Sequence, residues 1–195
     1  WRVTKPNAAI VLTASQPFTS ALVMSQINMF KYEWVWDKVN RYTGALQSNK
    51  RRMRRHEDIL VFSKKQTTYN KQFRKGKAYS VKRTGGHGEY HNGMDKDKVR
   101  IGLNDGNHNP CSVLEIPADN KKETGLHPTQ KPVALFEYLI KTYTNPGETV
   151  LDNCAGSGTT AVAAIRTGRK WVCIEKETSY YLGAVGRAWA AENAV

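Results

Sequence analysis

Residues 148–175 read ETVLDNCAGSGTTAVAAIRTGRKWVCIE, and this stretch decides the fold. Its first residues, ETVLDN, predict a buried strand, and the glycine-bearing turn after them leads into a helix from about 159 to 167. Gly168 ends that helix, WVCIE (171–175) predicts a second strand, and a final helix extends to about 193. A strand–helix–strand–helix order is typical of a parallel sheet flanked by helices, so we expect an α/β protein.

The glycine turn predicts a ligand site at the carboxyl end of the first strand. Gly156 and Gly158 remove side chains where a ligand must approach the backbone, and a helix that starts near Thr159 presents free N–H groups. Asp152 ends the first strand, and Glu175 ends the second, 19 residues after Gly156. A carboxylate at the tip of the second strand is where a doubly wound nucleotide site holds a ribose diol. The pattern therefore indicates an adenosine-bearing cofactor.

Two common nucleotide motifs do not fit this turn. A P-loop requires a Lys after its second Gly, and the chain has none between Gly158 and Arg166. A GxGxxG dinucleotide motif fails because Ala161 stands where the third glycine belongs. A tight strand-to-helix turn without any ligand remains the alternative.

The rest of the chain predicts regular structure on both sides of an irregular middle. Apolar or alternating runs predict strands at 8–15, 32–36 and 59–62, and a helix over 17–30. Between about 64 and 126 no periodicity is sustained and turn signals are frequent, and a helix then begins at Pro132. We expect three parts: 1–63, which includes strands at the sheet edge; 64–126, a target-recognition insertion; and 127–195, the cofactor-binding part.

The positive charge of the chain comes from one segment. The 195 residues include 30 Lys and Arg against 17 Asp and Glu, a net charge of +13, and residues 38–100 hold 18 of the basic and 5 of the acidic residues. A basic stretch with interleaved aromatic side chains is typical of a surface that binds nucleic acid. Its densest point precedes a strand predicted at the sheet edge, so these side chains can project together; a solvated loop is the alternative. The predicted DNA-binding residues are Arg51, Arg52, Arg54, Arg55, Lys64 and Lys65.

Composition excludes several other classes of protein. The three Cys are odd in number, which excludes a disulfide scaffold and fits a reducing, cytoplasmic compartment. No apolar run reaches the roughly 18 residues that span a bilayer, so no membrane partner is expected. His87, His91, His108 and Cys111 could offer ligands to zinc, but their spacing is not one of the standard pairs, and no metal site is predicted. Trp34 and Trp36 alternate along a strand and are expected to pack at the sheet edge.

Several motifs occur in a combination typical of one family. LDNCAGSGTTAVAA is followed by GRKWVCIEKETSYY, and HPTQKP (127–132) stands upstream. Together they resemble the cofactor motifs of S-adenosylmethionine-dependent DNA amino-methyltransferases in the permuted, β-type order. KPNAAIVLTASQPF, FKYEWVWDK and RRHEDILVFSK resemble further strands of that family, so the resemblance covers about 1–65 and 127–193. It implies a Rossmann-like methyltransferase fold of three layers with a mostly parallel sheet, incomplete at the N-terminus. The implied reaction is methyl transfer from S-adenosylmethionine to N6 of adenine or N4 of cytosine in DNA.

The resemblance also implies roles for individual residues. Asp152 and the turn 155–158 hold the methionine part of the cofactor, and Glu175 takes the ribose hydroxyls. Residues 129–132 cover the cofactor from the other side, with Lys131 near its carboxylate. The residues alone leave simpler interpretations open. Lys131 could be a solvated side chain, and Asp152 could be a cap of the glycine turn. The cofactor-binding residues so implied are Thr129, Gln130, Lys131, Pro132, Asp152, Cys154 (where the family commonly has Phe), Ala155, Gly156, Ser157, Gly158, Thr159, Thr160 and Glu175.

One element of the family pattern is missing. The chemistry of the family depends on an Asp/Asn/Ser-Pro-Pro-Tyr/Phe motif, and this chain contains no Pro-Pro pair. In the permuted order that motif stands upstream of Trp1, so we expect a piece of a longer enzyme that is inactive alone and holds no catalytic residue. A non-catalytic DNA-binding protein with a relict cofactor pocket is the alternative. The sequence leaves three points open: the DNA sequence that is recognised, whether adenine or cytosine is the target base, and whether the protein is a monomer or a homodimer.

Overall fold

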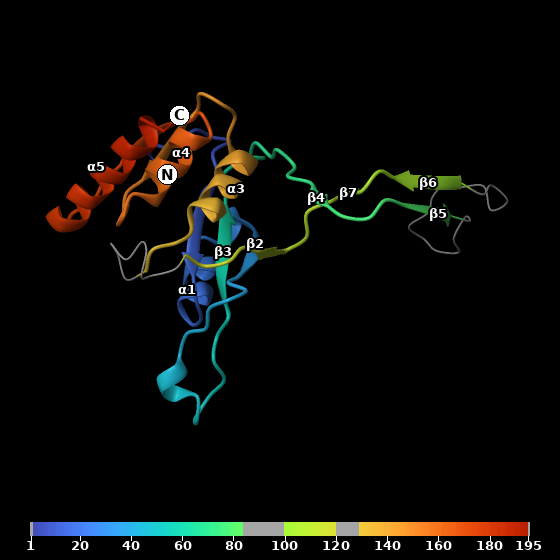
Figure 1. The fold of residues 1–195 in the computed structure, drawn as a ribbon, viewed down its shortest axis with the longest axis horizontal. Coiled ribbons are helices and arrows are strands. Elements are labelled where there is room, and N and C mark those ends of the chain that lie inside the picture. The colour runs from blue at the N-terminus through green and yellow to red at the C-terminus, as the bar shows by residue number, and fades with distance from the viewer. Residues whose placement is uncertain (1, 84–99, 120–128, 195) are drawn as a thin grey trace. The chain divides into compact units, whose positions relative to one another are not determined.

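The computed structural model describes residues 2–83, 100–119 and 129–194, which fall into two compact units. The first unit comprises residues 1–70 and 111–195, and the second comprises residues 71–110. Figure 1 shows the elements of both units in chain order. Among the described helices, none is long and apolar enough to cross a membrane.

The larger sheet of the first unit has four strands in the order β1-β3-β2-β8. Its strands are β1 (Ile10–Ala14), β2 (Phe30–Asp37), β3 (His56–Phe62) and β8 (Val113–Glu115). β3 runs antiparallel to both β1 and β2, and β8 runs parallel to β2. The prediction that β3 lies at the sheet edge is therefore wrong. Consecutive residues Ile59, Leu60 and Val61 are all fully buried, and such a strand needs a neighbour on each side and cover on each face.

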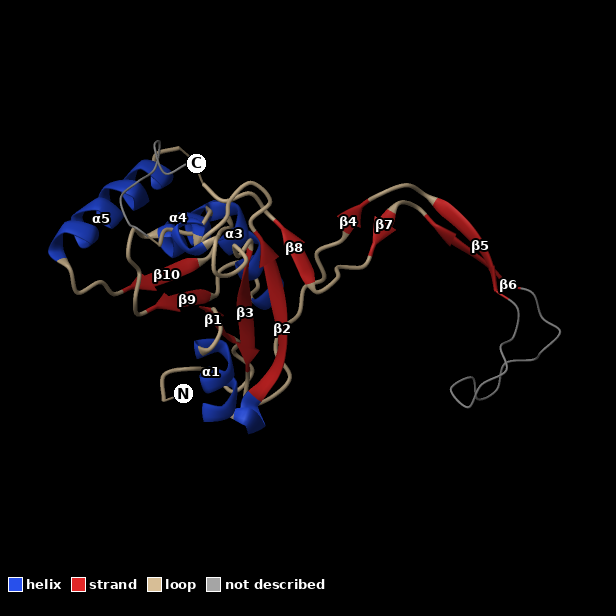
Figure 2. Cartoon of the chain, turned by 90° about the horizontal axis from the view of Figure 1, so that it is seen from below, coloured by secondary structure: helices blue, strands red, loops and turns tan. Residues whose placement is uncertain are grey.

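Helices cover both faces of this sheet (Figure 2). On one face, α3 (Val133–Tyr143) places Leu135, Leu139 and Tyr143 in a core with side chains of β2, β3 and β8. On the other face, α1 (Phe18–Ser25) packs over a second core around Leu60 and Phe62. The helix predicted over 17–30 is shorter than expected, because the 3-10 turn η1 (Ile27–Met29) ends it and β2 begins at Phe30.

Trp34 and Trp36 belong to the core beneath α3 and not to a sheet edge. Both side chains are buried, because β2 lies inside the sheet and their face of the strand is covered by α3. The indole N–H of Trp34 donates to the Tyr143 hydroxyl at 2.7 Å, and that of Trp36 donates to the Ile116 carbonyl at 2.8 Å. Burial raises the pKa of the Tyr143 hydroxyl, which also contacts the Tyr32 hydroxyl at 2.9 Å.

The strand–helix–strand–helix order predicted for the last third of the chain is confirmed. The elements are β9 (Thr149–Asp152), α4 (Thr159–Arg166), β10 (Lys170–Cys173) and α5 (Thr178–Glu192). β9 and β10 pair in parallel, with Cys173 opposite Asp152. β10 ends before Glu175, although the Ile174 amide still donates to the Asp152 carbonyl at 2.8 Å. The two predicted acidic residues, Asp152 and Glu175, thus lie at or just past the ends of neighbouring parallel strands. The α/β fold expected from the sequence is present.

The second unit consists of two short antiparallel ladders where the sequence shows no sustained periodicity. β4 (Arg74–Lys75) pairs with β7 (Asn107–His108), and β5 (Tyr79–Arg83) pairs with β6 (Arg100–Asn104). The Tyr79 and His108 rings stack at 5.6 Å between centroids. A Cβ on Gly76 would come within 2.6 Å of the His108 ring, so any larger residue there would displace that ring. The 71–110 unit lies inside the predicted insertion 64–126, whose bounds and role stay a prediction.

Candidate cofactor site and basic surface

The turn after β9 is fixed by a carboxylate at its start. One Asp152 oxygen accepts the Cys154 amide at 3.0 Å, and the other accepts the Thr160 hydroxyl from the first turn of α4. Gly156 and Gly158 have φ values of 53° and 74°, in the left-handed region that favours glycine. Asp152 therefore caps the turn, as one of the two readings of the sequence expected.

Glu175, two residues past the end of β10, closes the same turn from the other side. Its carboxylate accepts the Gly156 amide at 2.7 Å and the Glu177 amide at 2.9 Å. The Ala155 amide donates to the Ile174 carbonyl at 3.0 Å, so the two strand ends are held together by backbone as well. A carboxylate offers about four lone-pair sites. A carboxylate at this place in a doubly wound sheet is the kind of group that accepts two vicinal hydroxyls, such as those of the ribose of an adenosine-bearing cofactor.

Gly158 serves the packing of helices and not only the approach of a ligand. It is the N-cap of α4, and a Cβ on it would lie 2.8 Å from the Cβ of Ala184 and 3.0 Å from its Cα. The sequence-based prediction gave both glycines one reason, room for a ligand. For Gly158 the structure supplies a different one, the close crossing of α4 and α5.

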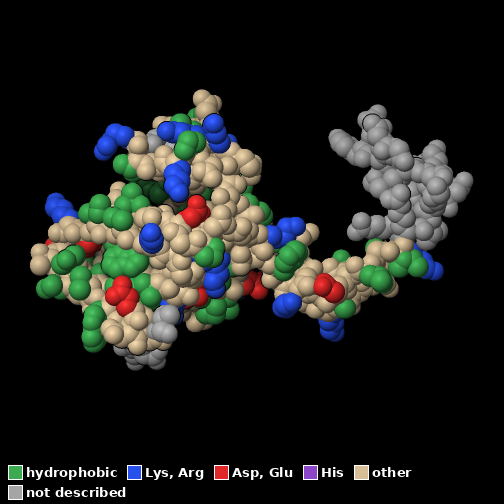
Figure 3. Space-filling model, turned by 90° about the horizontal axis from the view of Figure 1, so that it is seen from above, with side chains coloured by type: hydrophobic (Ala, Val, Ile, Leu, Met, Phe, Trp, Pro, Cys, Tyr) green, Lys and Arg blue, Asp and Glu red, His purple; other side chains and the backbone are tan. Residues whose placement is uncertain are grey.

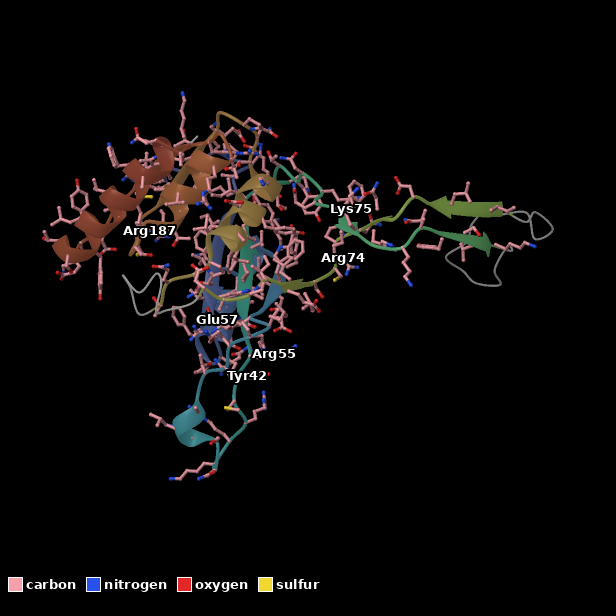
Figure 4. The ribbon with its side chains drawn as sticks, in the orientation of Figure 1. Tyr42, Arg55, Glu57, Arg74, Lys75 and Arg187 are labelled. Atoms are coloured by element: carbon pink, nitrogen blue, oxygen red, sulfur yellow. The ribbon has the colours of Figure 1, made fainter. Side chains whose placement is uncertain are left out.

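Arg187 is part of the site, and sequence reasoning missed it. From α5 its guanidinium donates to the Ser157 carbonyl at 2.7 Å and to the Ser157 hydroxyl at 3.0 Å (Figure 4). It also reaches the Thr159 hydroxyl at 3.4 Å, which in turn donates to the Lys131 carbonyl at 3.3 Å. Burial lowers the pKa of Arg187, but a guanidinium stays protonated in proteins. A signal was available, because Arg187 follows Ala184 by three residues on the helix face that also buries Ala188.

Residues 129–132 lie next to this turn, and Lys131 has a partner across the unit. Its ammonium group lies 3.3 Å from the Glu57 carboxylate of β3, and the Lys38 ammonium lies 2.6 Å from the same carboxylate. Burial opposes ionisation of Glu57, but the two cations prevail, so its pKa lies below the ordinary value. Lys131 is therefore not simply a solvated side chain, and its predicted place near a cofactor carboxylate stays a prediction. His127 and Pro128 lie outside the described residues.

Gln130 presents a buried acceptor. Its amide nitrogen donates to Asp119 at 3.4 Å, whereas its buried Oε1 has no hydrogen-bond partner among the described residues. Thr129 is exposed and Pro132 is buried at the start of α3. Ala155, Ser157, Thr159 and Thr160 are buried in or beside the glycine turn, and Cys154 is exposed. The predicted cofactor residues are thus brought together around the turn, with 129–132 linked to it through Thr159 and Arg187.

Two of the four arginines of the predicted DNA-binding cluster have partners within the fold, and the DNA-binding role of the cluster stays a prediction. Arg51 and Arg52 are exposed, but the Arg54 guanidinium reaches the Gln16 carbonyl at 3.5 Å and Arg55 forms an ion pair with Asp37. The reason is that the strand after them lies inside the sheet, so its neighbours β1 and β2 offer acceptors on both sides. Lys64 and Lys65, past the other end of β3, are exposed. Figure 3 shows Lys and Arg spread over the visible surface, with hydrophobic side chains between them.

A polar cavity of about 270 Å³ lies beside these arginines. Arg52 and Arg54 line it together with His56, Glu33 and Asp58. Part of the charge of the cluster is therefore balanced locally. Among the described residues no group of His, Cys, Asp and Glu could hold a metal ion, and His87 and His91 lie outside those residues.

The comparisons with known proteins found similarity to DNA methylases. A family model described as DNA methylase matches residues 1–185. The protein named "Putative methylase YubD" of Escherichia coli strain K12 is 42% identical over 69 residues, which cover 35% of this chain and 30% of that protein. The structure of an M1.HpyAVI–SAM complex shares 25% identity and a TM-score of 0.66, covering 95% of this chain and 76% of the other. The cytosine-N4-specific PvuII DNA methyltransferase is alike in fold, with a TM-score of 0.62 at 19% identity, covering 94% of this chain and 64% of the other.

Proposed function

The chain belongs to the DNA methylase family, and from that premise we propose that it serves methyl transfer from S-adenosylmethionine to an exocyclic amine, N6 of adenine or N4 of cytosine, in DNA. The observation that carries the proposal is the glycine turn held between Asp152 and Glu175 at the carboxyl ends of two neighbouring parallel strands. Nucleotide ligands bind at that edge of open α/β sheets.

The residues around the turn fit the cofactor. Glu175 would accept the ribose hydroxyls, while Asp152 and the turn 155–158 would hold the methionine part. The buried Gln130 Oε1, which has no hydrogen-bond partner in the part of the chain that the structure describes, and Lys131 would offer one acceptor and one cation on the opposite side. S-adenosylmethionine supplies the methyl group on a sulfonium centre. The work of this chain is to bind and orient that group and to keep water from it.

DNA is the proposed partner, and residues 71–110 are the proposed target-recognition part. A two-stranded antiparallel ribbon has the dimensions to enter the major groove. The β5–β6 ribbon exposes Ile101 and Leu103 beside Lys82 on one face, and Arg74 and Lys75 lie in the adjoining ladder. Apolar side chains can contact thymine methyl groups, whereas the cations would hold phosphates.

The cofactor assignment is tested by calorimetric titration with S-adenosylhomocysteine. Glu175→Gln keeps an acceptor for the Gly156 amide but removes the charge, and we expect Kd to rise about tenfold, since hydrogen bonds to charged groups contribute roughly 1.5–3 kcal/mol. Glu192→Gln, an exposed residue at the end of α5, is the matched control and should bind like the parent.

A ligand variant separates the direct contact from a weakened turn. The 2′-deoxy analogue of S-adenosylhomocysteine should bind the parent more weakly by a similar factor, and it should not weaken binding to Glu175→Gln any further. Equal losses with the analogue in both proteins would contradict the assignment of the ribose to Glu175.

A further inference from the structure

The segment between β2 and β3 forms a projecting finger, defined here as residues 40–55. Figure 1 shows it extending from the end of the sheet, and Figure 4 places Tyr42 and Arg55 at its base. It contains six Lys or Arg and no Asp or Glu. Such a surface is complementary to a polyanion and offers no carboxylate to repel one.

The base of the finger is firmly held. The Lys38 amide donates to the Arg55 carbonyl at 3.1 Å, and Arg55 pairs with Asp37 across the same point. Closer to the apex, the Thr43 amide donates to the Arg54 carbonyl at 2.8 Å, and the Arg54 amide donates to the Thr43 carbonyl at 2.9 Å. These contacts fix the direction of the finger before any partner arrives, which reduces the entropy lost on binding.

The apex is a tight turn that presents one leucine. Gly44, with φ of 91°, leads into the 3-10 turn η2 (Ala45–Gln47), and the Gln47 carbonyl accepts the amides of Lys50 and Arg51 at 2.9 Å. Leu46 at the centre of this turn is fully exposed. The turn therefore uses its backbone hydrogen bonds to hold an apolar side chain in solvent, four residues before the first of the cations Lys50, Arg51 and Arg52.

We propose that the finger is a wedge for duplex DNA, in which Leu46 enters the base stack while Lys50, Arg51 and Arg52 hold the flanking phosphates. The inference rests on the proposed function, because an exocyclic amine inside a duplex is reached only after its base leaves the stack. Leucine is among the apolar side chains that enter base steps and unstack them.

The position of the finger supports this role. Its root adjoins Glu57, whose carboxylate contacts Lys131 at 3.3 Å, within the segment 129–132 proposed to cover the cofactor. Lys38, two residues before the finger, contacts the same carboxylate at 2.6 Å, so the root of the finger and the segment 129–132 are joined through Glu57.

The test compares Leu46→Ala with the parent on two duplexes by fluorescence anisotropy. One duplex is fully paired, and the other carries a single abasic site, where the unstacking is already done. The parent should prefer the abasic duplex, and Leu46→Ala should lose about tenfold on it, in line with what one stacked or inserted side chain contributes. The slope of log K against log salt should not change, since no phosphate contact is removed.

Control variants isolate the wedge. Leu182→Ala removes a leucine that is 63% exposed on α5, far along the chain from the finger, and should bind both duplexes like the parent. Leu46→Phe, which restores an apolar wedge, should recover the preference for the abasic duplex. A 2-aminopurine beside the abasic site should brighten with the parent and with Leu46→Phe but not with Leu46→Ala.

Three outcomes would overturn the proposal in distinguishable ways. Equal binding of Leu46→Ala and the parent on both duplexes would reject the wedge and leave DNA binding intact. A change of oligomeric state in Leu46→Ala without a change in DNA affinity would show that the leucine joins two copies of the chain. Failure of the parent to bind either duplex would reject the proposed DNA partner itself.

Discussion

The partly buried carboxylate of Glu57 forms ion pairs with two lysines, Lys38 and Lys131. It joins β3 both to Lys38, at the end of β2, and to Lys131, just before α3. Burial raises the cost of its charge, and the two ammonium groups more than offset that cost. Removing the charge would deprive both ammonium groups of the counterion that they share.

Stability should therefore depend on pH through this residue. The pKa of Glu57 is lowered in the folded state, so its carboxylate stabilises the fold fully above the unfolded pKa, and this contribution is lost as the pH falls through the folded pKa. Glu57→Gln should reduce the free energy of unfolding at pH 7 by about 2 kcal/mol. Urea denaturation of both proteins at pH 7 and at acid pH measures the difference.

The difference between Glu57→Gln and the parent should shrink at acid pH, where the parent also loses the charge. The exposed Glu192→Gln serves as the control and should show no such difference. A gap between Glu57→Gln and the parent that stays constant with pH would mean that packing, and not charge, is what the substitution removes.

Individual residues differ in how far the sequence could predict them. Asp152 and Glu175 were found because strand ends and a glycine turn lie close in sequence, and that spacing places both carboxylates at one edge. Arg187 was not found, because its partner Ser157 is 30 residues away on another element. The packing reason for Gly158 likewise depends on Ala184 of α5, which no local pattern shows.

At the scale of elements, the finger divides the four arginines into two pairs with different surroundings. Arg51 and Arg52 lie toward the apex and are exposed, although Arg52 also lines the polar cavity with Glu33 and Asp58. Arg54 and Arg55 belong to its base, where they contact Gln16 and Asp37. A pair that already has acceptors within the fold has less to gain from a phosphate.

The two pairs should therefore respond differently to substitution. Arg51→Ala with Arg52→Ala should flatten the slope of log K against log salt on duplex DNA by up to about 1.8, since each phosphate contact contributes roughly 0.9. Arg54→Ala with Arg55→Ala should flatten it less and should lower the melting temperature instead. Anisotropy salt series and thermal denaturation of both double variants give the answer, and identical slopes for the two would contradict this division.

Elements whose periodicity is local were predicted well, and the order of strands was not. The stretch β9–α4–β10 and the helix after Pro132 were expected close to where they occur, because an apolar face repeats within each. The place of β3 inside the sheet was missed, since strand order depends on pairings between distant segments. The ladders of the second unit were missed because their strands are only two to five residues long, too short to show a sustained alternation.

At the scale of the whole chain, the cofactor motifs and the basic surface occur without the motif that the family uses to hold the target amine. No Pro-Pro pair is present in the sequence, and positioning of that amine is the larger part of the chemistry. We therefore expect that this chain can bind the cofactor and DNA without transferring the methyl group. The net charge of +13 favours association with DNA regardless of whether transfer follows.

The chain purified alone should transfer no methyl group. Tritiated-methyl incorporation into mixed-sequence DNA from labelled S-adenosylmethionine measures this directly. Titrations with S-adenosylhomocysteine and duplex DNA, run on the same preparation, should show that both ligands still bind. Incorporation above the level of a protein-free control would refute the expectation and assign the amine-holding role to residues within this chain.

Helix α3 has a consequence for how the molecule comes apart. Leu135 and Leu139 of this helix belong to the core on the larger sheet, while Ile140 belongs to the core that it forms with Ala163 and Ala164 of α4. A helix shared by two cores cannot leave one without opening the other. We expect the amides of β3 and α4 to exchange with solvent in one joint opening event, so that the cofactor turn and the root of the finger form a single cooperative folding unit.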